Sequence, residues 1–221
     1  MSAEDSGDKK YDDLMRAYRK LEDRFSKVLT ISDSYQAQLR DVLMRMDLMA
    51  HTDSLTGISN RRDMMDRLEI ELARAERYGS SFSIASFDID DFKRVNDLYG
   101  HDVGDIVLKQ VAGAFTENIR RSDSCARWGG EEFLVLFPET VLAEAALGAE
   151  KCRAAVAALS FESGDDRFDV TVSGGLCSYR LSGELGELLK AADEALYRAK
   201  NQGKNRIVSI PLPGDLSSGT N

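Results

Sequence analysis

The chain is poor in several residue types, and each scarcity argues against a class of protein. Its 221 residues include 3 cysteines and 3 prolines. Cys125, Cys152 and Cys177 are odd in number and lack metal-ligand spacing, so we expect reduced thiols rather than disulfides or a zinc site. No apolar run approaches the ~20 residues that cross a bilayer, and the polar, acidic first ten residues contain no signal sequence. We therefore expect a cytoplasmic protein without membrane insertion.

Positive charge is also in the minority. The chain carries 29 Lys and Arg against 38 Asp and Glu, a net charge of −9. This balance argues against a broad surface for nucleic acid or anionic membranes, so an anionic ligand must be held by local lysines and a metal. Hydrophobic residues make up 43% and charged residues 30%, which is ordinary for a globular domain with a core. The length suits one such domain plus an extension.

Residues 11–50 contain a sustained heptad repeat without proline or glycine. Such a pattern predicts a coiled-coil helix through which the chain forms a homodimer. The alternative is a long amphipathic helix packed on its own domain, but a surface helix normally has a wider apolar stripe. Ser32 is the polar exception in the seam and can fix its register. The seam positions are Tyr11, Leu14, Tyr18, Leu21, Phe25, Val28, Ser32, Tyr35, Leu39, Val42, Met46 and Met49.

The remainder divides into a globular domain, residues 51–210, and two ends, 1–10 and 211–221, that we expect to be disordered. Asn60 or Ser59 is expected to cap a helix to Tyr78, and Gly174-Gly175 suggests a bulge. Strands separated by helices, with one hairpin, predict an α/β fold in which helices cover a mainly antiparallel sheet. Further helices are expected at 90–99, 102–119, 142–159 and 185–201, and strands at 82–88, 124–126, 133–137, 168–179 and 206–210.

One hairpin turn is unusually acidic. Gly129 and Gly130 precede an apolar run, which is typical of a tight turn that uses glycine at positive φ. Glu131 and Glu132 follow directly, and crowded carboxylates favour a nearby cation. A lone Gly-Gly pair is usually no more than a turn, so a second acidic motif is needed before this turn indicates a cation site.

A second acidic cluster, after the strand expected at 82–88, provides that support. Residues 82–87 resemble a strand that runs into Asp88-Ile89-Asp90-Asp91. If this strand lies beside the one that follows Glu131, Asp88 and Glu131 can share a hard cation such as Mg²⁺, which prefers oxygen ligands and phosphate. Taken alone, an Asp cluster after a strand is more often a helix N-cap.

In this order, the motifs resemble the GGDEF domain of bacterial diguanylate cyclases, over roughly residues 51–208. The resemblance implies a sheet similar to that of nucleotidyl cyclases and polymerase palms, and the condensation of two GTP molecules into cyclic di-GMP with release of pyrophosphate. The motifs are Asp53-Ser54-Leu55-Thr56, Asn60-Arg61-Arg62, Phe87 to Asp97, Gly100 to Asp105 and Gly129-Gly130-Glu131-Glu132-Phe133.

The resemblance also implies roles for individual residues. Asp88, Glu131 and the Ile89 carbonyl correspond to ligands of Mg²⁺, with Mn²⁺ as an alternative, and Glu131 corresponds to the group that helps to deprotonate the attacking 3′-hydroxyl. Asn96 and Asp105 match the positions that recognise guanine, whose edge suits an amide and a carboxylate. The residues that match phosphate-binding positions are Lys93, Lys200 and Lys204.

Two departures from the family pattern accompany these assignments. Lys204 stands where the family often has arginine, so the charge stays but the bidentate geometry is lost. Glu131-Glu132 replaces the name-giving Asp-Glu, a variant that the family tolerates. Taken alone, Lys200 and Lys204 would more often be cations that offset the dipole of a helix C-terminus.

The segment Arg120-Arg121-Ser122-Asp123 resembles the RxxD site at which the family's product inhibits synthesis. Arg120 and Asp123 are the expected contacts, with Lys151, or less favourably Arg153, as the supporting basic residue. Taken alone, an Arg-rich helix end is usually solvated surface.

Each domain of this family binds one GTP, so a product with two phosphodiester links needs two domains. We expect the coiled coil to bring them together and a separate cytosolic regulatory protein to bind residues 11–50. Two rivals remain: a non-catalytic cyclic di-GMP receptor that signals through its coiled coil, and a structural adaptor.

Overall fold

The computed structural model of the chain describes residues 3–179 and 183–210, with the side chains of all of these except 3–13, 23, 45, 47 and 48. The chain divides into two compact units, of which the first ends at Leu48 and the second begins at Met49. We describe the two units separately.

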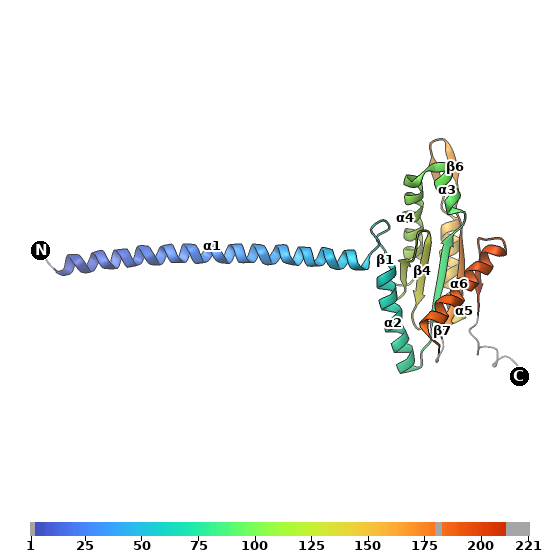
Figure 1. Ribbon diagram of the computed structural model, residues 1–221, viewed down its shortest axis with the longest axis horizontal. Coiled ribbons are helices and arrows are strands. Elements are labelled where there is room, and N and C mark those ends of the chain that lie inside the picture. Colours follow the sequence, from blue (N-terminus) through green and yellow to red (C-terminus); the bar gives the residue numbers. More distant parts are fainter. Residues whose placement is uncertain (1–2, 180–182, 211–221) are drawn as a thin grey trace. The chain divides into compact units, whose positions relative to one another are not determined.

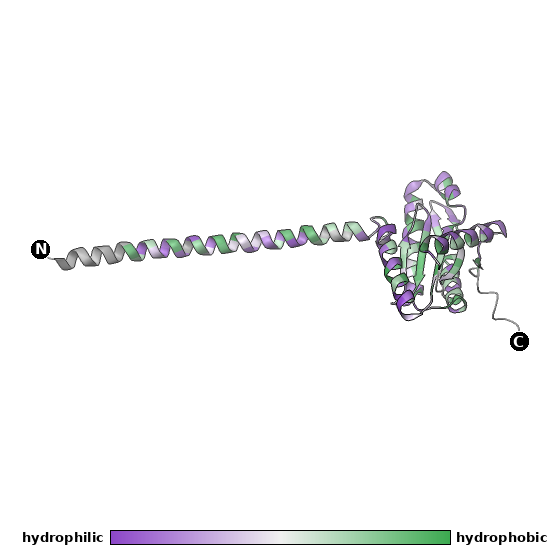
Figure 2. Cartoon of the chain, turned by 60° about the horizontal axis from the view of Figure 1, so that its bottom comes forward, coloured by the Kyte–Doolittle hydropathy of each residue, from purple (hydrophilic) through white to green (hydrophobic). Residues whose placement is uncertain are grey.

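The first unit is formed by most of the helix α1, which runs from Ala3 to His51 and so ends just inside the second unit. The expectation that residues 1–10 are disordered is therefore wrong from residue 3 onward, because extending an existing helix costs far less than nucleating one. The predicted seam lies exposed along α1, from Leu14 (66% exposed) through Phe25 (62%) to Met49 (78%), and Figure 2 shows apolar and polar residues interspersed along this helix. The side chain of Tyr11 lies outside the described set. Within the described ranges, no helix combines the length and apolarity that a bilayer span requires.

A capping arrangement marks the start of the second unit. The Asn60 side chain accepts a hydrogen bond from Asp63 N at 3.0 Å and donates to the carbonyl oxygens of Ala50 and Thr52. Asn60 is thus the N-cap of α2, as predicted, and Gly79 ends that helix in the left-handed conformation.

The second unit combines one larger sheet, a small hairpin and five helices in the described part of the chain. The helices are α2 (Arg61–Tyr78), α3 (Phe92–Tyr99), α4 (His101–Asn118), α5 (Leu142–Ala157) and α6 (Leu185–Asn201). The strands are β1 (Ser59–Asn60), β2 (Phe82–Ile89), β3 (Ser124–Arg127), β4 (Glu132–Phe137), β5 (Phe161–Ser163), β6 (Asp166–Phe168), β7 (Val172–Tyr179) and β8 (Ile207–Ser209).

The larger sheet has the strand order β1-β3-β4-β2-β7-β8. Its four central strands are antiparallel, while β1 and β8 pair in parallel at the two edges. The predicted mainly antiparallel sheet is therefore confirmed. The two-residue strand β1 was missed, because so short a segment carries no periodic signal.

Helices cover both faces of this sheet (Figure 1). One core cluster, with Phe87, Phe115 and Phe133 at its centre, joins the sheet to α4 and α5, and the second, with Phe82, Ile84 and Tyr179, joins it to α2 and α6. Residues of β2 alternate between these clusters, so every residue of this strand is buried. Figure 2 accordingly shows apolar central strands beneath helices with polar outer faces.

The segment 168–179 differs from the single bulged strand that we expected. Its first residue ends a separate hairpin of β5 and β6, and β7 then pairs with β2 in unbroken register through Gly174 and Gly175. No bulge interrupts these two glycines. Gly175 is required for another reason: a Cβ there would lie 2.1 Å from Ala192 O and 2.1 Å from Leu196 N, so its absence lets α6 approach the sheet.

We predict that Gly175→Ala destabilises the domain by about 1–3 kcal/mol, because the helix backbone cannot move away without opening the core. Gly186→Ala is the matched control, since Gly186 lies in α6, the helix that packs on Gly175, and a Cβ there meets no atom within 4 Å. Urea unfolding of both variants measures the difference. Equal stability of the two variants would contradict the assigned close approach.

Candidate active site

The pairing of β2 with β4 brings the two acidic motifs together. These strands are antiparallel, and Asp88 lies opposite Glu132 in their register. Beyond the last pair, Ile89 N donates a hydrogen bond to Glu131 O at 3.3 Å. The predicted neighbourhood of the two strands is confirmed, and it places Asp88, Ile89 and Glu131 at one end of the sheet.

The turn between β3 and β4 is held by Arg127 rather than by glycine conformation. Its guanidinium donates to Gly130 O at 3.0 and 2.7 Å and to both Asp53 oxygens at 3.3 Å. Gly129 and Gly130 are not at positive φ, so that part of our expectation is wrong. A Cβ on Gly129 would lie 2.4 Å from Glu132 Oε2, and Gly130 has open space around it. The glycines keep the turn free of side chains.

Asp53 anchors this turn to the segment that follows α1. Its carboxylate also accepts hydrogen bonds from Thr56 N at 2.9 Å and Thr56 Oγ1 at 2.6 Å. Partial burial opposes the charge of Asp53, but the bonds from Thr56 and Arg127 outweigh it and hold its pKa below the usual value. Asp53 lay in a recognised motif, but nothing in the sequence identified Arg127 as its partner.

Lys200 of α6 places a positive charge against the carboxylates. Its ammonium lies 2.7 Å from Asp88 Oδ1, a buried oxygen that otherwise accepts no hydrogen bond. Burial and the charge of Asp90 raise the pKa of Asp88 against the opposing effect of Lys200. Burial and the charges of Asp88 and Glu132 raise the pKa of Glu131, also against Lys200. A cation is therefore favoured here.

The donor set suits a hard divalent ion. Two carboxylates and a backbone carbonyl are oxygen ligands of the kind that Mg²⁺ and Mn²⁺ accept, and the ammonium already stands against one of them. In the described ranges, no group of three or more His, Cys, Asp or Glu side chains could hold a metal by itself. An ion at Asp88 and Glu131 would complete its shell with phosphate and water.

The other two predicted phosphate-binding lysines are Lys204, in the loop after α6, and Lys93, in α3. Lys204 Nζ contacts Asp91 Oδ1 at 2.6 Å, which raises the pKa of Lys204 through that hydrogen bond. Lys93 lies exposed in the first turn of α3. Asp91 occupies the N-cap position of α3 at φ 56°, as the N-cap alternative expected, but its side chain makes no capping hydrogen bond.

One of the two residues expected to recognise guanine, Asn96 of α3, packs against the first turns of α4, which carry the other, Asp105. Gly104 lies in the first turns of α4, next to Asp105, and a Cβ on Gly104 would fall 2.0 Å from Asn96 Oδ1. Gly104 thus leaves room for the Asn96 side chain beside the exposed Asp105. Sequence reasoning did not assign this function to Gly104.

The residues of the RxxD motif line a separate pocket of about 320 Å³ that also includes Lys151. Asp123 accepts a hydrogen bond from Arg120 N at 2.9 Å, which fixes the loop. Arg153 instead bonds to Glu150 and to the Asn205 side chain. This geometry favours Lys151 over Arg153 as the supporting cation.

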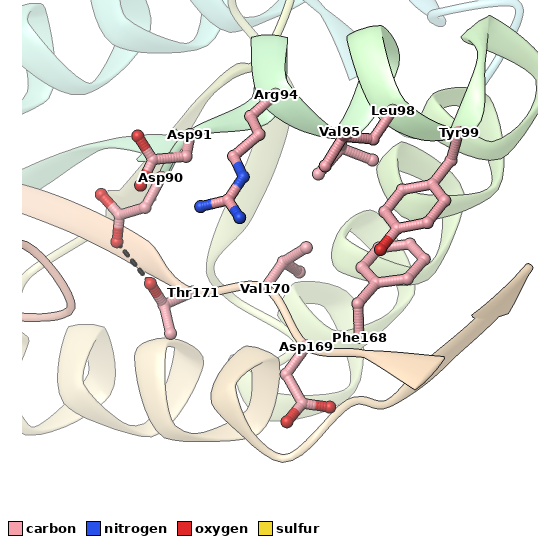
Figure 3. Close-up of a pocket in the computed structure, with 10 residues that line it drawn as sticks. All are labelled: Asp90, Asp91, Arg94, Val95, Leu98, Tyr99, Phe168, Asp169, Val170 and Thr171. Carbon is pink, nitrogen blue, oxygen red and sulfur yellow. Dashed lines mark hydrogen bonds between the residues drawn. The ribbon is translucent and has the colours of Figure 1, made fainter. Parts of the chain in front are cut away.

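A further cavity of about 280 Å³ lies beside the acidic cluster, between α3 and the segment from β6 to β7 (Figure 3). The stacked rings of Tyr99 and Phe168 (4.3 Å between centroids) form one wall, and Asp90 and Asp91 lie at the other. Arg94 points into the space between them, and Asp90 bonds to Thr171 across the strand ends.

Comparison with known proteins gives a consistent picture. A family model described as "Diguanylate cyclase, GGDEF domain" matches residues 50–206. Diguanylate cyclase DgcP of Pseudomonas aeruginosa is 45% identical over 159 residues, which are 72% of this chain and 24% of DgcP. Response regulator PleD of Caulobacter vibrioides is 41% identical over 177 residues, which are 79% of this chain and 39% of PleD. The chain thus spans about a quarter to two fifths of the length of these relatives.

Two solved structures are similar over most of their length. Diguanylate cyclase SiaD of Pseudomonas aeruginosa, in complex with its activator SiaC, superposes with a TM-score of 0.72 at 38% identity, covering 94% of this chain and 80% of the chain in that structure. The coiled coil and GGDEF domain of DgcB from Caulobacter crescentus, in complex with c-di-GMP, superposes with a TM-score of 0.79 at 31% identity, covering 84% of this chain and 99% of that one.

We predict that Arg127→Lys destabilises the domain by about 1–2 kcal/mol, because an ammonium cannot bridge Gly130 O and both Asp53 oxygens at once. The control is Arg167→Lys: Arg167 (71% exposed) pairs with Glu162 (68% exposed) on the surface, where the loss should stay below about 0.5 kcal/mol. Thermal unfolding of both variants tests this. A loss no larger for Arg127→Lys than for the control would show that the bridge is not structural.

Proposed function

Since the chain belongs to the GGDEF family of diguanylate cyclases, we propose that it condenses two GTP molecules into cyclic di-GMP at the interface of a dimer. In each of two steps, the 3′-hydroxyl oxygen of one GTP attacks the α-phosphorus of the other. A P–O bond to pyrophosphate breaks, the hydroxyl proton is released, and two pyrophosphates leave in total.

The observation that carries this proposal is the juxtaposition of Asp88 and Glu131 with the Lys200 ammonium at one end of the sheet. The residues that would hold Mg²⁺ or Mn²⁺ are Asp88, Glu131 and the Ile89 carbonyl. Bound there, the ion supplies Lewis acidity that lowers the pKa of the 3′-hydroxyl and shields the triphosphate charge.

The protein's own residues position the reactants. Lys93, Lys200 and Lys204 hold the phosphates, and Lys200 exchanges its contact with Asp88 for one with phosphate when the site fills. Glu131 assists removal of the hydroxyl proton. Asn96 and Asp105 bind the guanine edge, and adenine is rejected because it would leave the carboxylate without its donors.

The coiled coil accounts for how two domains meet. A stripe of large apolar side chains along α1 is exposed in the single chain, and pairing with a second copy would cover it. Tethering makes the encounter of two domains intramolecular and raises their effective concentration. The SiaD structure contains an activator protein, which supports our proposal that a regulatory protein also acts on residues 11–50 of this chain.

The proposal also includes inhibition of synthesis by bound product and a cellular location for the activity. The pocket that joins Arg120, Asp123 and Lys151 is suited to a phosphodiester with a nearby base, and we assign it to bound cyclic di-GMP. The three cysteines are buried and outside any disulfide, and GTP is a cytoplasmic metabolite, so we place the activity in the cytoplasm.

We expect Glu131→Gln to reduce the rate of cyclic di-GMP formation by at least about 100-fold, because a neutral amide binds the metal more weakly than a carboxylate and cannot take the proton. Chromatography of nucleotides after incubation with GTP and Mg²⁺ measures this. The matched control is Glu162→Gln, a surface carboxylate on β5, which should be as active as the unaltered protein.

The same assay separates the rivals. A Glu131→Gln variant that remains active would remove the assigned role of Glu131. An unaltered protein that retains cyclic di-GMP but makes none would be a receptor, and one that neither makes nor binds it would be an adaptor.

We also expect the double substitution Phe25→Asp and Val28→Asp to lower the specific activity at least about tenfold at nanomolar protein, with recovery at high concentration. Both side chains are exposed apolar residues of the seam (62% and 61%), and charges there prevent pairing. Lys27→Asp, off the seam, is the control. Specific activity that stays independent of dilution in the seam variant would contradict the role of α1 in dimerisation.

A further inference from the structure

Asp90 is a buried carboxylate near the candidate site that accepts three hydrogen bonds, although none of the assigned roles includes it. The residue is 7% exposed. Oδ1 accepts a hydrogen bond from Ser173 Oγ at 2.7 Å, and Oδ2 accepts from Thr171 Oγ1 at 2.6 Å and from Asn205 N at 3.0 Å. Its backbone N–H donates to Thr171 O at 2.8 Å. Figure 3 shows the Asp90 carboxylate turned toward Thr171.

These bonds separate the functions of two aspartates that are only two residues apart. Asp88 Oδ1 has no hydrogen-bond partner other than the Lys200 ammonium, which a cation can replace. Both Asp90 oxygens are instead occupied by donors of the protein itself. The pattern Asp88-Ile89-Asp90 therefore contains one group available to a metal and one committed to structure.

The donors come from segments that are far apart in sequence. Thr171 and Ser173 lie at the start of β7, whereas Asn205 belongs to the loop between α6 and β8. Asp90 itself follows the last residue of β2, which carries the proposed metal ligands Asp88 and Ile89. One carboxylate thus fixes the end of the metal-binding strand against the loop that carries Lys204.

This loop needs such an anchor. Lys204 and Asn205 adopt φ values of 61° and 48°, a left-handed conformation that non-glycine residues hold only where their surroundings impose it. Beyond the bond to Asp90, the contacts of this loop include Lys204 N to Ala199 O (3.1 Å), Arg206 Nε to Lys204 O (3.1 Å), the Lys204–Asp91 pair and Arg153 on the Asn205 side chain. Of these, only the bonds of Asp90 and Asp91 reach the end of β2.

We propose that Asp90 is a positioning residue of the cyclase, which sets the phosphate-binding Lys204 loop at a fixed place relative to the metal-binding strand end. This inference rests on the proposed function. It assigns to Asp90 no contact with substrate or metal: Asp90 acts through Asn205 and the Lys204 that precedes it.

Steady-state kinetics of Asp90→Asn in a double-mutant cycle with Lys204→Met test the proposal. An asparagine cannot accept all three bonds, so we expect the KM for GTP to rise about tenfold in Asp90→Asn, with kcat changed less. If Asp90 acts through Lys204, adding Asp90→Asn to Lys204→Met will raise KM by less than about twofold more. A KM increase in the double variant equal to the product of the two single increases would overturn the proposal.

Milder variants guard against a general loss of folding. Thr171→Val and Ser173→Ala each remove one donor to Asp90 and should raise KM in the same direction by a smaller factor. Thr116→Val is the matched control, because its hydroxyl bonds to Ala112 O within α4 and should leave KM unchanged. If Thr171→Val and Ser173→Ala are both as silent as this control, the proposal fails.

A second readout does not depend on turnover. Hydrogen exchange at the Asn205 amide should accelerate at least about tenfold in Asp90→Asn, while the amides of the β2–β4 ladder remain protected. Unchanged exchange at Asn205 would overturn the positioning role. If the unaltered protein forms no cyclic di-GMP and does not bind α,β-methylene-GTP with Mg²⁺, the proposed function fails instead, and the exchange result still decides whether Asp90 anchors the loop.

Discussion

The structure depends on keeping two carboxylates together that would separate in water. Asp88 and Glu131 lie at the end of two paired strands. Burial raises the pKa of both, with a further rise from the charge of Asp90 on Asp88 and from the charge of Asp88 on Glu131. Backbone pairing between β2 and β4 fixes them, and the Lys200 ammonium offsets part of the charge. Because the packed core holds the two carboxylates together, this end of the sheet attracts cations.

The same end of the sheet depends on elements that contribute no ligand. Gly175 lets α6 lie close enough to the sheet for Lys200 to reach Asp88. Arg127 connects the acidic turn to Asp53, just beyond α1, and Asp90 connects the strand end to the Lys204 loop.

Most of the fold followed from the sequence because its signals are local. Asn60 as a cap, Gly79 as a helix end, and strands at 82–88 and 133–137 were all predicted, since capping, glycine conformation and apolar runs act within a few residues. The errors concern long-range context. The Gly174-Gly175 pair was interpreted as a bulge because its neighbour α6 cannot be inferred from local pattern, and the hairpin of β5 and β6 carries little apolar periodicity.

The sequence by itself determined the family, the order of elements and which acidic and basic residues are candidates for chemistry, because motif spacing and periodicity are properties of the linear chain. The resemblance assigned Asp88 rather than Asp90 to the metal, but only the tertiary structure shows the physical reason for that division. Asp88 and Asp90 are chemically identical and two residues apart, yet one faces a lysine and the other accepts three hydrogen bonds. That difference arises from donors supplied by β7 and by the loop before β8, and chain folding alone brings those segments together.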